Sequence, residues 1–198
     1  MPHEQSRVTL HMVASLDGFI ARRDGSVDWL ETPDRFEGGT ALTPELVAGF
    51  LDAIDCYVMG SRTYEAALEF EARGLGWAYG DKPTCVLAHR TLPRTRDSVE
   101  FLSGDLVRLF DEELTPRFRN IWVVGGGRVC GECLRLSLAD EVRYAIVPVV
   151  IGDGIPFFQG LGTDSPLHLL DVTPYDSGMV ELRYAVRRDR PAVNAWST

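Results

Sequence analysis

Residues 121–129 read IWVVGGGRV, and this stretch decides the class of fold. The apolar residues 121–124 predict a short buried strand, and the three glycines let the backbone turn and pass close to a ligand. A helix that begins after them offers free N–H groups to an anion. The dinucleotide fingerprint G-x-G-x-x-G is not met, because Cys130 stands where its last glycine belongs. We therefore expect a strand, a turn and a helix, either as a phosphate-binding turn or as a bare tight turn.

Apolar runs of this kind alternate with segments of helical periodicity along the chain, which predicts an α/β fold. The last expected strand alternates apolar and polar residues, so one of its faces should be solvated. The expected strands cover residues 8–14, 56–59, 84–88, 120–124, 141–147 and 180–186. Residues 15–40 are rich in Gly and Asp and are expected to form a long, functional loop.

Four helices are expected. Thr43-Pro44 opens the first, with a capping hydroxyl followed by proline at the first helical position. One face of this helix is apolar and consists of Leu46, Val47, Phe50, Leu51 and Ile54. A second helix covers residues 60–74, Ser103 caps a third, and the fourth covers residues 127–136.

The composition is that of a globular protein. With 198 residues, 45% of them hydrophobic, and no linker or internal repeat, the chain is expected to form one domain, with a core at about 8–187 and a loose tail at 188–198. The net charge is −9 and no basic run exceeds Arg187-Arg188, which disfavours binding to nucleic acid or to an anionic membrane. Residues 1–7 are polar, and no segment approaches the roughly 20 apolar residues of a membrane span. We expect a cytoplasmic protein.

The four cysteines and four histidines do not suggest a metal site. Three of the cysteines lie in apolar surroundings, which predicts buried thiols. Cys130 and Cys133 form a C-x-x-C, but no second Cys/His pair follows at the spacing of a zinc site. We expect no bound metal.

Two further junctions carry polar residues at strand ends. Residues 58–65, VMGSRTYE, place two hydroxyls and Arg62 at the mouth of a helix, which suits a phosphate; an ordinary helix cap with a surface arginine is the alternative. Residues 86–93, VLAHRTLP, place His89 and Arg90 just past a strand end, where α/β sheets bind ligands; solvated loop charges are the alternative. Together the three junctions imply a long, multiply phosphorylated ligand across the strand ends.

Six motifs occur in the order found in a known family: SLDGFIA (15–21), MGSRT (59–63), HRTLP (89–93), VGGG (124–127), LADEV (138–142) and PVVIGDGIPFF (148–158). Over about residues 8–186 the chain thereby resembles the dihydrofolate reductase superfamily, and specifically the C-terminal reductase domain of riboflavin-biosynthesis deaminase–reductases. The resemblance implies a single mixed, mostly parallel sheet of about eight strands flanked by helices, with NADPH lying across the strand ends. It also implies a cis peptide bond between Gly125 and Gly126, and a homodimer.

The resemblance assigns roles to the matching positions. The pyrophosphate and the 2′-phosphate would be held by Gly60, Ser61, Arg62 and Thr63. The adenosine phosphate would be bordered by Ala88, His89 and Arg90. The pyrophosphate would also be cradled by Gly125, Gly126, Gly127, Arg128 and Val129. The nicotinamide would be bordered by Ala14, Ile20 and Ala21, with residues 15–40 as an active-site lid.

The proton donor is assigned by the same resemblance. In dihydrofolate reductases a Trp precedes the catalytic carboxylate by five positions, and here Trp29 stands five residues before Asp34. Pro33 is shifted relative to that pattern, and Asp28 and Glu31 compete for the role. A loop acid facing the solvent is the other alternative.

The expected activity is hydride transfer from NADPH to a C=N or C=O bond of a small heterocyclic or ribosylamino substrate, resembling 5-amino-6-(5-phosphoribosylamino)uracil reductase. The alternatives are a dihydrofolate or pterin reductase and a non-catalytic NADPH-binding protein. The chain lacks the H-x-E…P-C-x-x-C pattern of the zinc deaminase that accompanies this domain in the bifunctional proteins, so its substrate need not be the pathway intermediate.

Overall fold

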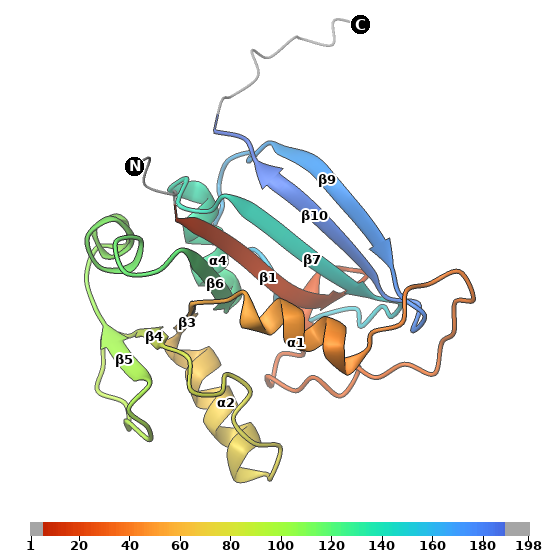
Figure 1. The fold of residues 1–198 in the computed structure, drawn as a ribbon, viewed down its shortest axis with the longest axis horizontal. Helices are drawn as coiled ribbons and strands as arrows, with labels where there is room; N and C mark the ends of the chain where they lie inside the picture. Colours follow the sequence, from red (N-terminus) through yellow and green to blue (C-terminus); the bar gives the residue numbers. More distant parts are fainter. Residues whose placement is uncertain (1–5, 189–198) are drawn as a thin grey trace, which may run out of the picture.

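The computed structural model describes residues 6–188, which form one large sheet with helices on both faces and one small sheet (Figure 1). The strands are β1 (Arg7–Ser15), β2 (Phe19–Ala21), β3 (Cys56–Gly60), β4 (Thr84–Leu87), β5 (Val99–Leu102), β6 (Asn120–Gly125), β7 (Glu141–Val147), β8 (Ile155–Pro156), β9 (Leu167–Pro174) and β10 (Val180–Val186). The helices are α1 (Pro44–Asp52), α2 (Ser61–Ala72), α3 (Leu106–Arg108), the π-helical turn η1 (Leu109–Leu114) and α4 (Gly127–Arg135).

The large sheet has eight strands in the order β5-β4-β3-β6-β1-β7-β10-β9. The six strands from β5 to β7 are parallel, and β10 pairs antiparallel with both β7 and β9. The predicted fold, a mixed and mostly parallel sheet of the dihydrofolate reductase type, is confirmed. Because parallel strands all end at one edge of a sheet, the chain leaves β1, β3, β4, β5, β6 and β7 at the same edge, where α/β sheets bind ligands.

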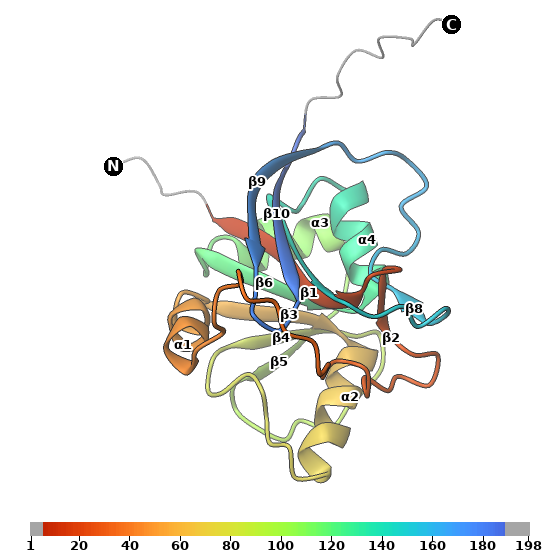
Figure 2. The same cartoon turned by 90° about the vertical axis from the view of Figure 1, so that its right-hand side faces the viewer.

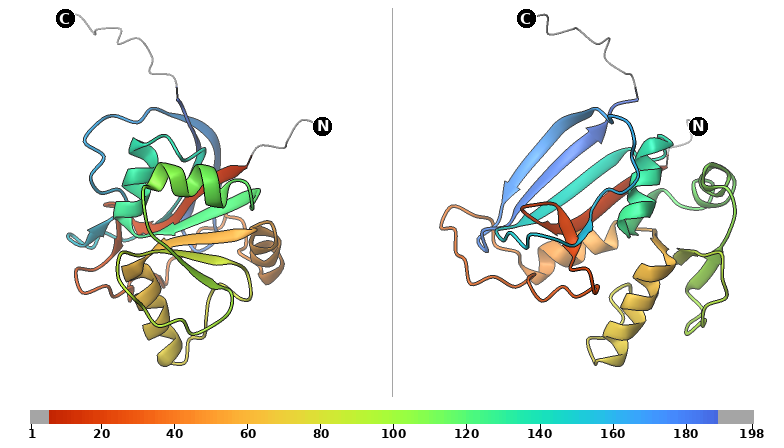
Figure 3. Two further views of the ribbon diagram at one scale, coloured as in Figure 1. Left: turned by 90° about the vertical axis from the view of Figure 1, so that its left-hand side faces the viewer. Right: turned by 180° about the vertical axis from the view of Figure 1, so that it is seen from behind.

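The helices divide between the two faces of the sheet (Figure 2), and each face has its own core. Alternate residues of β3 show why. Cys56 and Val58 face the core under η1 and α4, while Tyr57 and Met59 face the core under α1 and α2. A strand buried on both faces must be apolar throughout, as residues 56–59 are. Figure 3 shows the β9–β10 hairpin and the β4–β5 pair at opposite ends of the sheet.

Four strands were not among those expected from the sequence. Strand β5 has only four residues, with a charged residue in its interior. Strands β2 and β8 have three and two residues and form the small sheet, with β2 inside the loop predicted at 15–40. Strand β9 combines leucines with His168 and Asp171 and is exposed along most of its length. Short or edge strands carry little apolar periodicity, so their pairing depends on the neighbouring strand.

The prediction that Ser103 caps the third helix is wrong. The N-cap is Asp105, which directly precedes α3, and its Oδ1 accepts a hydrogen bond of 3.0 Å from the backbone N–H of Arg108. Both residue types are good caps, but it is the carboxylate of Asp105 that reaches an N–H group of the first turn. The helix continues as η1, which buries Phe110 and Leu114.

Helix α1 begins as predicted, with the Thr43 hydroxyl accepting a hydrogen bond from the N–H of Leu46 at 3.3 Å. Its apolar face is buried only in part, because Leu46 and Val47 are exposed. The C-terminal turn is the part that packs on the sheet, through Phe50, whose ring lies edge-on to Trp122 at 5.2 Å.

The prediction of a solvated face on β10 is wrong at Glu181. Glu181 on that face is buried, and it accepts a hydrogen bond of 2.5 Å from Arg143 of β7. Because Glu181 and Arg143 pair with each other beneath α1, this part of the face needs no water. Of the predicted tail, Arg188 pairs with Asp140, and residues 189–198 lie outside the described part of the chain. None of the described helices has the length and apolar composition that a membrane span requires.

Candidate functional site

Two helix N-termini meet at the edge of the sheet where β3 and β6 end. Gly60 is the N-cap of α2 and Gly126 the N-cap of α4, and neither helix has a side-chain hydrogen bond at its cap. A Cβ atom on Gly60 would lie 3.9 Å from the N atom of Gly126, so the two caps are in contact. The first-turn N–H groups of both helices, with their positive dipole ends, are therefore directed to one place, which suits an anion such as a diphosphate.

The glycine turn between β6 and α4 has no room for larger residues at its two ends. Gly125 has a φ of +129°, and a Cβ atom there would lie 2.7 Å from the sulfur of Met12. A Cβ atom on Gly127 would lie 3.0 Å from the carbonyl oxygen of Phe157. Gly126 instead has room for a Cβ atom, which would make an ordinary contact of 3.5 Å with Oγ1 of Thr63. The peptide bond between Gly125 and Gly126 is cis, so that prediction is confirmed.

The arginines beside this turn have no partner among the described residues. Arg62 lies in the first turn of α2 and Arg128 in the first turn of α4, and both are exposed. Within residues 6–188 neither forms an ion pair or a side-chain hydrogen bond. In a chain with a net charge of −9, two unpaired guanidinium groups beside two uncapped helix ends form a local positive site.

A cavity of about 350 Å³ opens where β4 and β5 end. It is lined by Ala88, His89, Arg90, Thr91, Leu92, Phe101, Leu102 and Ser103. The first three are among the residues predicted from the sequence, whereas Phe101 and Leu102 come from β5, a strand that was not expected. Arg90 forms an ion pair with Glu65 of α2, which connects the cavity to the helix that begins at Gly60.

On the other side of the glycine turn, the residues expected at the nicotinamide lie at the end of β1 and in β2. Ala14 and Ala21 are buried, and Ile20 packs against the core. The strand end is held by Asp17, whose carboxylate accepts hydrogen bonds from the N–H groups of Ile151 at 3.3 Å and Gly152 at 2.7 Å. The Ser15 hydroxyl and these N–H groups keep the pKa of Asp17 below its usual value.

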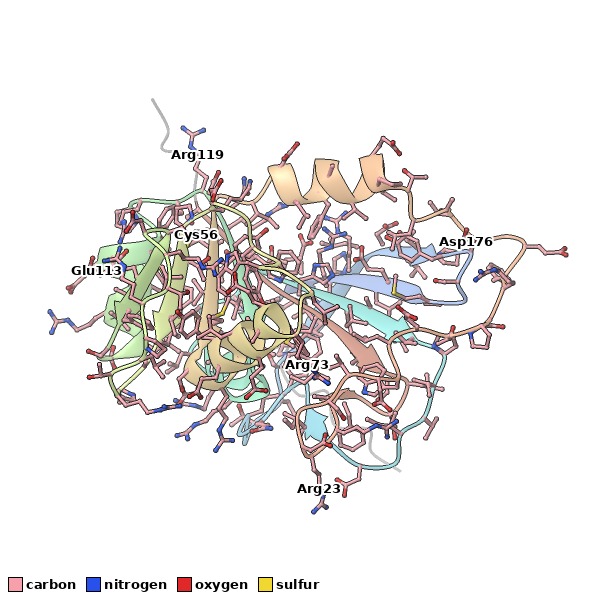
Figure 4. The ribbon with its side chains drawn as sticks, turned by 90° about the horizontal axis from the view of Figure 1, so that it is seen from below. Arg23, Cys56, Arg73, Glu113, Arg119 and Asp176 are labelled. Atoms are coloured by element: carbon pink, nitrogen blue, oxygen red, sulfur yellow. The ribbon has the colours of Figure 1, made fainter. Side chains whose placement is uncertain are left out.

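The predicted lid is attached at both ends. Its C-terminal part runs beside the β9–β10 turn, where the N–H of Phe36 donates to the carbonyl of Asp176 at 2.9 Å and the N–H of Thr40 donates to the carbonyl of Pro174 at 2.8 Å (Figure 4). Near its N-terminal end, Arg23 forms an ion pair with Asp153 on the loop after β7. The lid thus spans the end of the sheet from the small β2–β8 sheet to the β9–β10 turn.

The candidate proton donors lie on this lid in different surroundings. Trp29 is buried, and its indole N–H has no hydrogen-bond partner in the described part of the chain. Asp34 is exposed at the β9–β10 turn, where its carboxylate contacts Gly178 so closely that a Cβ atom there would overlap it. Asp28 pairs with Arg22 at 2.7 Å, which lowers the pKa of its carboxyl, and Glu31 is exposed. The role given to Asp34 stays a prediction.

The family model of the RibD C-terminal domain matches residues 6–181. This chain belongs to the RibD C-terminal domain family. The match covers β1 through the start of β10 and therefore includes both helix caps, the cavity and the lid.

Relatives of this RibD C-terminal domain include the uncharacterized protein YwjB of Bacillus subtilis (strain 168), 29% identical over 181 residues that cover 91% of this chain and 98% of that protein. The fold of this domain is similar to that of a protein from Shewanella sp. PV-4 named "putative riboflavin biosynthesis protein", with a TM-score of 0.76, 24% identity, and coverage of 92% of this chain and 99% of that one.

The fold is also similar to that of the diaminohydroxyphosphoribosylaminopyrimidine deaminase/5-amino-6-(5-phosphoribosylamino)uracil reductase of Thermotoga maritima, with a TM-score of 0.65 and 16% identity. That similarity covers 93% of this chain and 57% of the Thermotoga chain. At these identities the solved structures show a shared fold.

Proposed function

We propose that this protein is an NADPH-dependent reductase that transfers a hydride to a C=N or C=O bond of a small heterocyclic or ribosylamino substrate. The observation that carries the proposal is the meeting of two uncapped helix N-termini, Gly60 on α2 and Gly126 on α4, beside the unpaired Arg62 and Arg128. Two findings support this class of reaction: the chain belongs to the RibD C-terminal domain family, and its fold is similar to that of the Thermotoga deaminase/5-amino-6-(5-phosphoribosylamino)uracil reductase.

The residues at the sheet edge fit NADPH in size and charge. A diphosphate needs several N–H donors and positive charge, which the first turns of α2 and α4 provide together with Arg62 and Arg128. The cavity of about 350 Å³ beside Arg90 is large enough for an adenosine group, and the lack of a side chain at Gly126 lets the backbone approach the diphosphate closely. Nothing larger than glycine fits at Gly125 or Gly127, so this cradle depends on these two glycines.

When bound, the cofactor supplies the hydride, and the protein positions the two reacting rings. Ala14, Ile20 and Ala21 would form an apolar border that keeps water from the nicotinamide, and the lid would close over it. A carboxyl on the lid would assist protonation of the substrate, and we assign this role to Asp34. Trp29 is proposed to support it, since its buried indole N–H is free to donate to a group that arrives with the substrate.

Cofactor oxidation with a panel of acceptors tests the proposal. The reduced-nicotinamide absorbance should fall when a ribosylaminouracil acceptor is added and should not fall without an acceptor. Oxidation with dihydrofolate or a pterin alone would favour the alternative reductase. Tight NADPH binding with no turnover on any acceptor would favour a non-catalytic NADPH-binding protein.

We further propose that the protein is a homodimer. The edge strand β9 exposes four aliphatic side chains between 37% and 49%, those of Leu167, Leu169, Leu170 and Val172. An exposed apolar edge strand is a site of association unless it is covered, and a second copy of the chain would cover it symmetrically. A light-scattering mass near twice 22.0 kDa at micromolar concentration is expected; a mass of 22.0 kDa would contradict the proposal.

A cytoplasmic location is also part of the proposal. All four cysteines are free and buried, and the sulfurs of Cys56 (labelled in Figure 4) and Cys85 lie 3.7 Å apart without a bond. A reducing compartment keeps such a pair as thiols. Titration of the denatured protein should therefore find four free thiols per chain; fewer would argue for an oxidising compartment.

A further inference from the structure

Glu65 places a carboxylate against Arg90, one of the residues that line the proposed adenosine cavity. It lies one turn into α2, and it forms an ion pair with Arg90, which lines the cavity. Both side chains are partly exposed, so ligands from the solvent can reach them. The hydrogen bond from Arg90 to Glu65 also raises the pKa of Arg90, which keeps that guanidinium charged.

This pairing sets Arg90 apart from the other arginines of the proposed site. Arg62 and Arg128 have no partner in residues 6–188, whereas Arg90 is already bound to a carboxylate. A phosphate that approaches Arg90 must therefore displace Glu65 or bind beside its negative charge. Either arrangement weakens the attraction between Arg90 and a phosphate.

The two residue types of the pair recognise the two dinucleotide cofactors differently. A guanidinium group binds the 2′-phosphate of NADPH, and a carboxylate accepts a hydrogen bond from the ribose 2′-hydroxyl of NADH. Arg90 follows the end of β4 and Glu65 faces it from α2, beside the cavity proposed for the adenosine. The chain thus carries both recognition groups in direct contact with each other.

We propose that the Glu65–Arg90 ion pair sets the balance between NADPH and NADH, with Glu65 competing against the 2′-phosphate for Arg90 and accepting the 2′-hydroxyl of NADH. This proposal rests on the proposed function. Glu65 keeps the preference for NADPH below what the arginines alone would provide, and so it leaves the protein able to bind both cofactors.

Fluorescence titration of NADPH and NADH into the wild type, Glu65→Gln and the control Glu69→Gln tests the proposal. The substitution Glu65→Gln keeps the size of the side chain and removes its charge, so NADPH should bind about threefold to tenfold more tightly and NADH more weakly. Glu69 lies one turn further along α2 and is exposed, so Glu69→Gln removes the same charge away from the cavity. This control should change either dissociation constant less than about twofold, in the range of ordinary surface charges.

The Arg90→Ala background separates competition for Arg90 from simple repulsion. If Glu65 acts by occupying Arg90, the gain in NADPH affinity from Glu65→Gln should disappear when Arg90 is absent. A gain that persists there, an unchanged NADPH-to-NADH ratio in Glu65→Gln, or weaker NADPH binding would overturn the proposal. If the wild type binds NADPH and one of these results is found, only the role of the ion pair is refuted. If the wild type binds neither cofactor, the proposed function is refuted as well.

Discussion

Two regions of this molecule contain arginines that differ in exposure and in pairing. At the edge where β3 and β6 end, Arg62 and Arg128 are exposed and have no partner among the described residues. On the sheet face beneath α1, Arg143 is largely buried, pairs with Glu181 at 2.5 Å, and stacks on Phe50 at 4.1 Å from the ring centroid.

The difference shows that the partner of an arginine, more than its position in the sequence, separates a ligand-binding residue from a structural one. A buried carboxylate neutralises Arg143 and leaves no charge for a ligand, and its removal would leave an uncompensated charge inside the protein. The unpaired arginines cost the folded protein little, because water solvates them, and they are available to an anion.

The largest expected effect concerns the buried pair. Glu181→Gln should lower the free energy of unfolding by about 3 kcal/mol, because it leaves Arg143 without its counter-charge while His11 remains uncharged beside it. Urea denaturation measures this. The control Glu112→Gln breaks an exposed pair with Arg108 and should cost under about 0.5 kcal/mol. Equal losses in both variants would remove the distinction between the two regions.

The next effect concerns a carboxylate that belongs to neither region. Asp34→Asn should reduce turnover at neutral pH by about 10² or more, because it removes the proposed proton donor, and it should leave NADPH binding intact. Asp28→Asn and Glu31→Gln, on the same lid, are the matched controls. If one of these controls loses turnover and Asp34→Asn does not, the assignment passes to that residue; if none does, the proton comes from water or from the substrate.

At the region of the unpaired Arg62 and Arg128, the expected effect is a change of about tenfold in the preference for NADPH over NADH. NADPH should bind at least about tenfold more tightly than NADH in the wild type, and Arg62→Ala should remove most of that preference, since a charge-assisted contact contributes roughly 1.5 to 3 kcal/mol. Arg73, at the other end of α2 (Figure 4), is the matched control, and Arg73→Ala should keep the preference. Unchanged discrimination in Arg62→Ala would defeat the assignment.

The last effect appears only in acid. Burial, and then the charge of Arg143, lowers the pKa of His11 from 6.5 to about 3 in the folded state. Between these values the unfolded chain binds a proton that the folded protein does not, so the stabilisation is present above pH 6.5 and is lost as the pH falls. When the pH falls from about 7 to about 5, the free energy of unfolding should therefore decrease by about 2 kcal/mol less in His11→Gln than in the wild type. Parallel pH profiles of urea unfolding for the two proteins would contradict this.

The sequence by itself determined the elements whose signals are local. The run at residues 56–59 is apolar at every position, which is typical of a strand covered on both faces. Thr43-Pro44 combines a capping hydroxyl with a proline whose φ already suits the first helical turn. The three glycines at 125–127 identified the turn between β6 and α4 for the same reason, since their backbone freedom needs no distant partner.

The tertiary structure decided what depends on partners distant in sequence. Strand β5 exists because β4 lies beside it, and its four residues carry no clear periodicity of their own. Gly60 and Gly126 are 66 positions apart by their numbers and meet only because β3 and β6 are neighbours in the sheet. In the sequence Glu65 is an ordinary residue of a helix surface, and only the fold brings Arg90 against it. Local propensity acts over a few residues, whereas charge pairing and sheet order are set by which segments become neighbours, and folding alone determines that.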